Sequence, residues 1–395
     1  MQRRRLLALG CAHCAALAAW PLAARAQAPG ATVASPSAWL APPRFARPEV
    51  ATDEGGLWAM MDREETRMRR SPFLIRDAAL RDYLQGIAAK LAGEHAADVR
   101  VYPVRTPFFN ASMAPNGMMQ VWSGLLLRVD NEAQLAAVIG HEIGHYMQRH
   151  LLDRLRDMKA RAAFGMFIGM LGPVGQIGQL GVLASAFGFS RDQERDADSV
   201  GLALLARAGY DPREASKVWD NLRAELVASQ GADAGKSSPM FATHPPSDER
   251  RATLAQLAES ATGGFLGAAE YAAKLEPLRF GLLEDELKRG QYGETLVLLD
   301  RMAQREPQRA DLLYFRGETR RLRAKDGDLD QALVDLQQAV VLGSEPVQVH
   351  RAIGYIHQRR EQWPEARAAF SRYVERAPEA PDVSLIKTYL TESKS

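Results

Sequence analysis

A short stretch, His141-Glu142-Ile143-Gly144-His145, has the residue types and spacing of a metal-dependent hydrolytic site. Residues four apart on an α-helix share one face, so the rings of His141 and His145 would point the same way. Two such imidazoles can hold zinc, and Glu142 can reach a water on that metal as a general base. Apolar neighbours indicate a buried helix, in which these polar groups would be costly without a partner. The pattern therefore predicts a zinc site.

A zinc site needs a third protein ligand, and a second predicted helix start supplies one. Glu194 and Asp198 are four residues apart within residues 190–201, so they would share a helix face. Glu194 would complete a set of two histidines and one carboxylate. Asp198 would accept a hydrogen bond from the far nitrogen of a liganding histidine. The neighbouring residues Asp192 and Asp196 are interpreted as ordinary acidic residues of a helix start.

The histidine pair requires a long helix, and the sequence predicts one over residues 132–154. Asp130 or Asn131 would be its N-cap, with an acidic first turn that favours the helix dipole. His150 lies nine residues past His141 on this helix, which would place it on the opposite face. We therefore interpret His150 as a structural residue.

Periodicity predicts two helices and a small β-sheet before the active-site helix. Helices are expected at 57–68 and 80–91, and strands at 99–104 and 118–122, the second after a turn at 116–117. Zinc peptidases generally hold substrate by adding it to an exposed sheet edge. We expect one edge of this sheet to lie beside the zinc. The alternative is that the second strand is a plain internal one.

Four motifs in order resemble peptidase family M48. The first two are the HExxH and ExxxD patterns at 141–145 and 194–198. Residues 110–126 resemble the family's strand-turn segment, with Asn116-Gly117 in place of paired glycines, and residues 243–250 are close to its THPxxxxR motif. The resemblance covers about residues 50–260. It implies a zincin-type endopeptidase with Glu142 as the catalytic base and with one zinc ion bound by three residues, His141, His145 and Glu194.

His244 lies in a proline-flanked loop and has two candidate roles. It could be catalytic and hydrogen-bond the oxyanion that forms as the peptide carbonyl is attacked. It could instead fill the fourth zinc position and silence the enzyme. We hypothesise that both states exist and that loop movement switches between them. The simpler alternative is a surface histidine fixed by Pro245 and Pro246.

The first 26 residues have the pattern of a secretory signal peptide. Arginines near the start precede an apolar run over 6–22, and residues 24–26 form a small-x-small cleavage site. The arginines leave open the choice between general secretory and twin-arginine export. Both cysteines, Cys11 and Cys14, would be removed with the signal, which suits an oxidising compartment. We expect a periplasmic protein.

Residues 163–189 are strongly apolar and long enough to cross a bilayer. Pro173, Gln176, Gln179 and several glycines interrupt the run, and charged residues crowd both of its ends. We interpret it as a flexible cover over the site that contacts substrate or the membrane periphery. An integral membrane span is the alternative.

The C-terminal part resembles tetratricopeptide repeats (TPRs). One copy covers residues 347–378, an earlier copy precedes it, and a degenerate half begins at Leu287. Small residues are expected where paired helices touch, as at Gly317 and Gly354. Two and a half repeats are marginal alone, so we expect the array to lean on the peptidase domain and to dock another protein. The family resemblance suggests outer-membrane assembly machinery as that partner.

The predicted fold class is α+β, mostly helical: a zincin-type peptidase domain with a small β-sheet, then an α-helical TPR-like array. The expected segments are a signal peptide (1–26), a disordered leader (27–52), an M48-like zinc peptidase domain (53–278) and a TPR-like repeat domain (279–395). The near-neutral balance of 50 basic and 48 acidic residues gives no sign of nucleic-acid binding.

The expected function is that of an exported zinc endopeptidase acting on misfolded or misassembled envelope proteins. Two alternatives remain. One is a non-proteolytic periplasmic chaperone or scaffold whose zinc site is blocked. The other is a membrane-integral protease of the same family.

Overall fold

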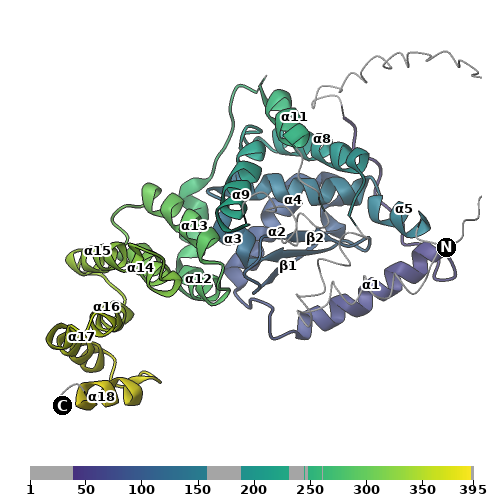
Figure 1. Ribbon diagram of the computed structural model, residues 1–395. Coiled ribbons are helices and arrows are strands. Elements are labelled where there is room, and N and C mark those ends of the chain that lie inside the picture. Colours follow the sequence, from purple (N-terminus) through teal and green to yellow (C-terminus); the bar gives the residue numbers. More distant parts are fainter. Residues whose placement is uncertain (1–38, 158–187, 231–243, 245–247, 260, 393–395) are drawn as a thin grey trace, which may run out of the picture. The chain divides into compact units, whose positions relative to one another are not determined.

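The computed structural model describes residues 39–157, 188–230, 244, 248–259 and 261–392. Helices dominate, and three short strands form one small sheet (Figure 1). The predicted α+β, mostly helical class is confirmed. Up to the end of the active-site helix, the elements are α1 Asp53–Arg70, α2 Ala78–Ala92, the 3-10 helix η2 Gly93–Asp98, β1 Arg100–Val104, β2 Ala111–Met113, β3 Met118–Trp122, α3 Ser123–Arg128 and α4 Glu132–Met147.

In the described residues after Met147, the remaining elements are all helices. None of the helices in the described part of the chain is long and apolar enough to cross a membrane. The remaining helices are α5 His150–Asp157, α8 Arg191–Arg207, α9 Glu214–Gln230, α11 Asp248–Ala258, α12 Ala268–Lys288, α13 Tyr292–Arg305, α14 Ala310–Arg323, α15 Asp328–Val341, α16 Gln348–Arg359, α17 Trp363–Arg376 and α18 Val383–Glu392.

Side-chain caps fix where the site-bearing helices begin. Asn131 caps α4 by accepting a hydrogen bond from the backbone N–H of Gln134 at 2.9 Å, which decides between the two predicted N-caps. Ser190 and Gln193 form a reciprocal capping box at the start of α8. Both caps satisfy backbone donors that a helix start leaves unpaired. The starting points of the helices that carry His141 and Glu194 are therefore fixed.

The sheet has the strand order β1-β3-β2. β1 pairs parallel to β3, with Arg100 opposite Met118, and β2 pairs antiparallel, with Ala111 opposite Val121. The strand predicted at 118–122 is therefore the internal one, and the sheet edges belong to β1 and β2. Phe73 and Ile75 cover part of the β1 edge through backbone hydrogen bonds. β2 has no strand partner on its outer side among the described residues, and it contacts α4.

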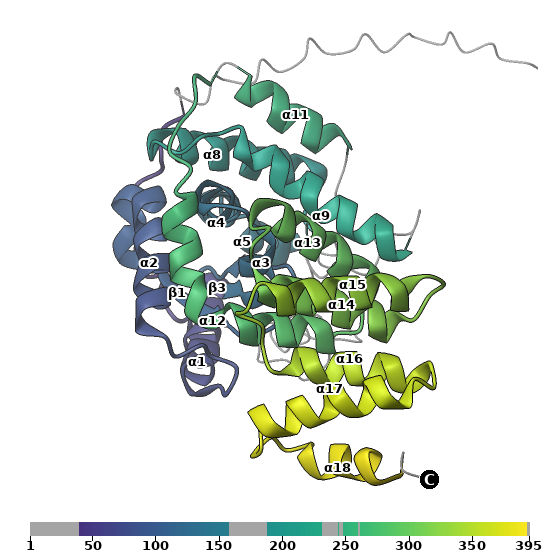
Figure 2. The ribbon, with the colours of Figure 1, turned by 90° about the vertical axis from the view of Figure 1, so that its left-hand side faces the viewer.

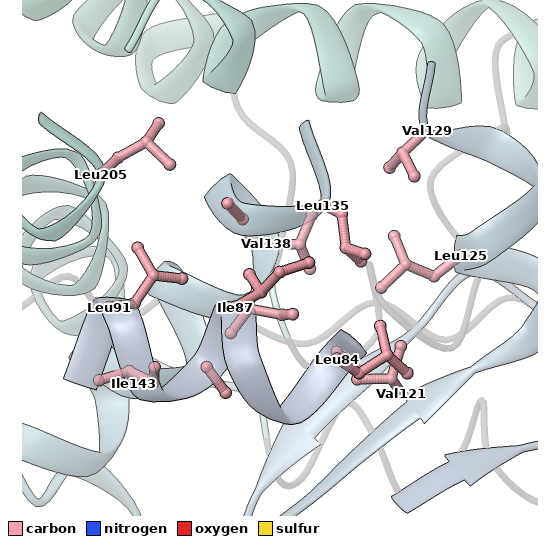
Figure 3. Close-up of a cluster of buried hydrophobic side chains, with 14 of the residues drawn as sticks. Leu84, Ile87, Leu91, Val121, Leu125, Val129, Leu135, Val138, Ile143 and Leu205 are labelled. Carbon is pink, nitrogen blue, oxygen red and sulfur yellow. The ribbon is translucent and has the colours of Figure 1, made fainter. Parts of the chain in front are cut away.

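The active-site helix α4 lies in the middle of the first core. Figure 2 looks roughly along α4, with α8 above it and α2 and α9 on either side, and all three pack against it. Figure 3 shows aliphatic side chains from α2, β3, α3, α4 and α8 meeting in this core, among them Leu84, Val121, Leu125, Ile143 and Leu205. Buried apolar residues on both sides of the histidines confirm the expected buried helix.

The helix predicted over 132–154 is in fact two helices. α4 ends at Met147, Arg149 has the left-handed φ of 58°, and α5 begins at His150. Arg149 forms an ion pair with Glu54, and its guanidinium lies 5.2 Å from the ring centre of Phe45. These distant contacts hold a backbone conformation that a non-glycine residue rarely adopts. The turn changes the direction of the chain immediately after the histidine pair.

Residues 39–52 follow a defined path along the surface of the first core. Trp39 and Phe45 pack against that core, and the Phe45 ring lies edge-on to His95 at 5.3 Å. The predicted disordered leader is therefore wrong for this stretch, while its earlier part lies outside the described residues. The proline- and alanine-rich composition suggested disorder, but the two aromatic side chains in this stretch pack against the apolar surface of the core.

The C-terminal helices pack in consecutive pairs, α14 with α15 and α16 with α17. A Cβ at Gly317 would lie 2.8 Å from Leu336 Cγ, and one at Gly354 would lie 2.4 Å from the Phe370 ring. Small residues therefore stand where paired helices touch, as the repeat pattern predicted. The TPR assignment itself stays a prediction.

The boundary predicted at residue 278 falls inside α12. Leu278 packs against the first core and also against the second core, which belongs to the C-terminal helices. Leu127, at the end of α3, is itself a member of that second core. The first helices of the array therefore pack against the first core, as expected from the small number of repeats.

Candidate metal centre

Four buried side chains converge at one point between α4, α8 and the loop before α11. They are His141, His145, Glu194 and His244, each offering one ligand atom, and these atoms lie within 4.8 Å of one another. The Nε2 atoms of His141 and His145 are 3.1 Å apart, and His145 Nε2 is 3.5 Å from Glu194 Oε1. Helices far apart in the sequence thus bring together the predicted set of two imidazoles and a carboxylate.

Small residues allow α4 and α8 to approach closely enough for this. Gly140 and Gly144 on α4 face Gly201 and Ala197 on α8. A Cβ at Gly144 would lie 2.8 Å from the backbone oxygen of Ala197, and one at Gly201 would lie 3.0 Å from the backbone nitrogen of His141. Larger side chains would push the helices apart. This spacing lets Glu194 reach the histidines.

The side of His141 that faces away from the cluster meets Asp198, as predicted. His141 Nδ1 lies 2.9 Å from Asp198 Oδ1. Arg250 donates two hydrogen bonds of 2.8 Å to the two oxygens of that carboxylate. Burial alone would raise the pKa of Asp198, but the charge and hydrogen bonds of Arg250 hold it below its usual range. A charged carboxylate therefore fixes the ring of His141.

Sequence reasoning missed Arg250. Its Nη1 is also 2.5 Å from Glu194 Oε2, and its guanidinium lies 5.1 Å from the ring centre of Trp219. Arg250 is the last residue of the motif at 243–250, so its position in that motif could have indicated a role in the site. Its role depends on how α11 approaches α8, which residue spacing does not reveal.

His145 is held differently, by two residues that lie outside the paired motifs. Its Nδ1 lies 2.9 Å from His150 Nδ1. The ring of Phe189 stacks on the ring of His145, with centroids 3.9 Å apart and an interplanar angle of 24°. The prediction that His150 lies on the opposite face is wrong, because the turn at Arg149 brings it back towards His145.

Glu142 lies next to the cluster, with its carboxylate buried. Its Oε1 has no hydrogen-bond partner among the described residues, although His244 Nε2 is 3.5 Å away. Burial raises the pKa of this carboxyl group above its usual value. A buried, under-bonded carboxylate is costly, and such groups are characteristic of functional sites.

His244 lies inside the cluster and is not a surface residue. Its Nδ1 is 2.9 Å from Glu194 Oε1 and 3.2 Å from His141 Nε2, and the side chain is buried. Burial alone would raise the pKa of Glu194, but the positive charge of neighbouring His244 and hydrogen bonds from the histidines hold it far below its usual range. The alternative of a surface histidine fixed by prolines is wrong.

These residues fit a zinc ion. Zinc prefers imidazole nitrogen and carboxylate oxygen in a four-coordinate arrangement, and the cluster offers three imidazoles and one carboxylate. The carboxylate of Asp198 beside the far nitrogen of His141 matches the usual support of a metal-bound imidazole. The apolar segment 163–189, predicted to cover the site, lies outside the described residues except for Gly188 and Phe189.

Comparisons with known proteins agree with this reading. Residues 75–258 match the family model described as Peptidase family M48. The chain is 35% identical over 156 residues to the mitochondrial metalloendopeptidase OMA1 of Arabidopsis thaliana, covering 40% of this chain and 31% of that protein. It is 30% identical over 234 residues to the beta-barrel assembly-enhancing protease of Yersinia pestis, covering 53% and 47% respectively.

The corresponding protease of Escherichia coli K12 is 27% identical over 228 residues, covering 52% of this chain and 45% of that protein. The chain thus spans less than half the length of each of these relatives.

Proposed function

We propose that the protein is a zinc endopeptidase that hydrolyses peptide bonds of other proteins, since residues 75–258 match the family model of peptidase M48. The observation that carries the proposal is the buried, under-bonded Glu142 carboxylate beside four convergent ligand atoms. An ion held there would lower the pKa of a water molecule to about 7 and polarise the peptide carbonyl.

The side chains would divide the reaction as follows. His141, His145 and Glu194 hold the ion. Glu142 accepts the proton of the attacking water and delivers it to the leaving amine, a role that suits a carboxyl group whose pKa burial has raised. Asp198 fixes the orientation of His141.

The substrate would lie along the outer edge of β2, the strand that contacts α4. Main-chain hydrogen bonds along a sheet edge give affinity without strong sequence selectivity. This arrangement suits an enzyme that acts on proteins that have lost their structure.

His244 is proposed to silence the site in the conformation described here. Its Nδ1 approaches the cluster as closely as the ligand atoms approach one another, so it competes for the position that water needs. Loop movement would withdraw it, after which it could hydrogen-bond the oxyanion. Raised cleavage by His244→Ala would support silencing, whereas lost cleavage with zinc retained would support the catalytic role.

We propose that the protein is exported to the periplasm and acts on misfolded or misassembled envelope proteins, with its TPR-like helices docking the outer-membrane assembly machinery. The N-terminal signal pattern supports export. The printed names of the Yersinia and Escherichia relatives support the connection to β-barrel assembly. A non-proteolytic scaffold remains the second candidate, because a histidine inside the cluster could keep the site closed.

The test compares casein cleavage and zinc content in wild type and Glu142→Gln, each also in a His244→Ala background. Glu142→Gln should keep its zinc and its folded structure, and its cleavage rate should fall by about 10²–10⁴-fold, the usual contribution of a general base. The matched control is Glu132→Gln on the same helix, where a buried carboxylate accepts hydrogen bonds from Tyr83 and Tyr210 instead.

Equal cleavage by Glu142→Gln and wild type would overturn the base assignment. Absence of chelator-sensitive cleavage from both wild type and His244→Ala would instead favour the scaffold.

A further inference from the structure

The two motif histidines direct one ring nitrogen into the cluster and the other away from it. For His145, Nε2 faces the cluster, 3.1 Å from His141 Nε2, and Nδ1 faces His150. Two ring nitrogens 2.9 Å apart share a single hydrogen, so one donates and the other accepts. A His145 ring that offers Nε2 to a metal carries its hydrogen on Nδ1. His145 is therefore the donor, and His150 Nδ1 is the acceptor.

The fold places His150 there by means of a left-handed turn. On a continuous helix His150 would lie roughly 140° around the axis from His145 and could not face it. Arg149, with its φ of 58°, redirects the chain, and Glu54 and Phe45 hold the Arg149 side chain. The turn at Arg149 and its contacts with Glu54 and Phe45 thus place the His150 ring behind the His145 ring.

The face of the His145 ring is covered independently by Phe189. The two rings are nearly parallel, with an interplanar angle of 24° and centroids 3.9 Å apart. Phe189 directly precedes Ser190, the cap of the helix that carries Glu194. The stacked ring is therefore tied to the helix that supplies the carboxylate ligand.

Among the described residues, His141 has no imidazole behind it and no ring stacked on its face. A carboxylate, Asp198, lies behind it, and the nearby Trp219 ring meets it edge-on at 6.2 Å and 74°. The two histidines of one motif are thus oriented by different chemistry. A carboxylate is an acceptor on every oxygen, whereas an imidazole accepts at one nitrogen only. The support of His145 therefore requires His150 to carry its own hydrogen on Nε2, the nitrogen that lies 4.0 Å from Asp196 Oδ2.

We infer that His150 and Phe189 are positioning residues of His145, His150 by accepting the hydrogen of Nδ1 when Nε2 binds the metal and Phe189 by holding the plane of the ring. The inference rests on the proposed zinc site. It gives a role in orienting His145 to two residues outside the HExxH and ExxxD motifs. Both should act on metal affinity and ligand geometry without touching substrate.

The experiment measures the zinc affinity of the full-length protein by competition with a chromogenic chelator. His150→Leu removes the acceptor and should weaken zinc binding about 10–100-fold, the usual effect of losing such a partner. His150→Asn keeps an acceptor oxygen close to the position of Nδ1 and should stay within a few-fold of wild type. Phe189→Leu should weaken binding less than His150→Leu, and Phe189→Tyr, which keeps the ring, should bind as wild type does.

Two further readouts separate positioning from general stability. The visible absorption spectrum of the cobalt-substituted protein should change in His150→Leu and Phe189→Leu but not in the two conservative variants. The melting temperature of the chelator-treated protein reports the fold alone. The matched control is His350→Leu in α16, which removes another buried histidine far along the chain and should leave zinc affinity and the cobalt spectrum unchanged.

Zinc affinity equal to wild type in folded His150→Leu and Phe189→Leu would overturn the inference. Equal weakening by His150→Asn and His150→Leu would overturn the hydrogen-bond role. If His150→Leu does not fold, the comparison of His150→Asn with wild type decides, because an unchanged affinity and spectrum are required of it. Failure of wild type to bind zinc would instead overturn the proposed function.

Discussion

Two of the buried clusters of ionisable side chains among the described residues are built in opposite ways. In the first, Arg128 of α3 pairs with Glu225 of α9 at 2.7 Å and with Glu286 of α12 at 2.8 Å. Arg301 of α13 reaches Glu225 as well, at 2.9 Å. Each carboxylate therefore has a guanidinium partner. Burial alone would lower the pKa of Arg128, but the surrounding carboxylates raise it above its usual value.

The metal cluster instead brings lone pairs together. Three imidazoles and a carboxylate point at one place, and Glu142 Oε1 lacks a partner among the described residues. Arg250 is the guanidinium of this group, and it lies behind the ligands, on Asp198 and Glu194. A buried ionic cluster in which every charge is paired stabilises the fold. A buried cluster whose hydrogen-bond acceptors converge on one point favours a bound cation. This difference identifies the metal site better than burial or charge does alone.

The largest expected effect comes from breaking the complete cluster. Arg128→Met leaves Glu225 and Glu286 buried without their main partner and should lower the free energy of unfolding by about 3–5 kcal/mol, as measured by urea denaturation.

The triple change Arg128→Met, Glu225→Leu and Glu286→Leu should recover most of that loss, since a buried ionic group can often be replaced by apolar residues of similar volume. A triple variant less stable than the single variant would show that these charges do more than fill the space between α3, α9 and α12. No comparable apolar replacement should preserve zinc binding at the metal cluster.

A smaller effect is expected from Asp198→Asn in the metal cluster. Loss of the negative charge behind His141 should weaken zinc binding about 10–100-fold, or about 1.4–2.7 kcal/mol, in chelator competition. The matched control is Asp335→Asn in α15, where an equally buried aspartate pairs with Arg316 and Arg320. Asp335→Asn should change stability but not zinc affinity. A similar loss of affinity in both variants would contradict a local role for Asp198.

The smallest effect concerns acid sensitivity at Glu65, a buried carboxylate outside both clusters. Burial alone would raise its pKa, but hydrogen bonds from Arg100 and Tyr102 lower it to about 2. Because the folded-state pKa lies below the usual 4.5, the stabilisation is complete above about pH 4.5 and is lost as the pH falls towards 2.

The stability difference between wild type and Glu65→Gln should therefore shrink between pH 5 and pH 3, by at most about 1.4 kcal/mol per pH unit. Solvent screening of the partly exposed Arg100 makes the change smaller. Urea denaturation at several pH values measures it. A constant difference over this range would mean that Glu65 keeps an ordinary pKa. Zinc affinity should not differ between the two proteins at neutral pH.

The predicted site residues that the structure brings together were found from local periodicity. His141 with His145, and Glu194 with Asp198, needed only the geometry of one turn of helix. Bringing the two pairs together required the family resemblance, because the Gly144–Ala197 contact between the helices cannot be read from either helix alone.

The residues that were missed depend on tertiary contacts. His150 was placed on the wrong side because Glu54 and Phe45 stabilise a turn at Arg149 that its own sequence does not favour. The role of Arg250 requires α11 to approach α8. In the fold, the strand at 118–122 was found, but its internal position depends on pairing with β2, three residues long and too short to show a pattern.

The continuity of α12 determines where the chain can be shortened. A truncation at residue 278 would cut this helix near its middle. It would remove Glu286, the partner of Arg128, and expose the Leu127 side chain to solvent. A cut in the short connection after Arg305 keeps α12, α13 and the whole ionic cluster with the first core. A shortened chain that preserves the packing around the metal cluster therefore includes the first helical hairpin of the array, and the helices from α14 onward are the part that can be exchanged.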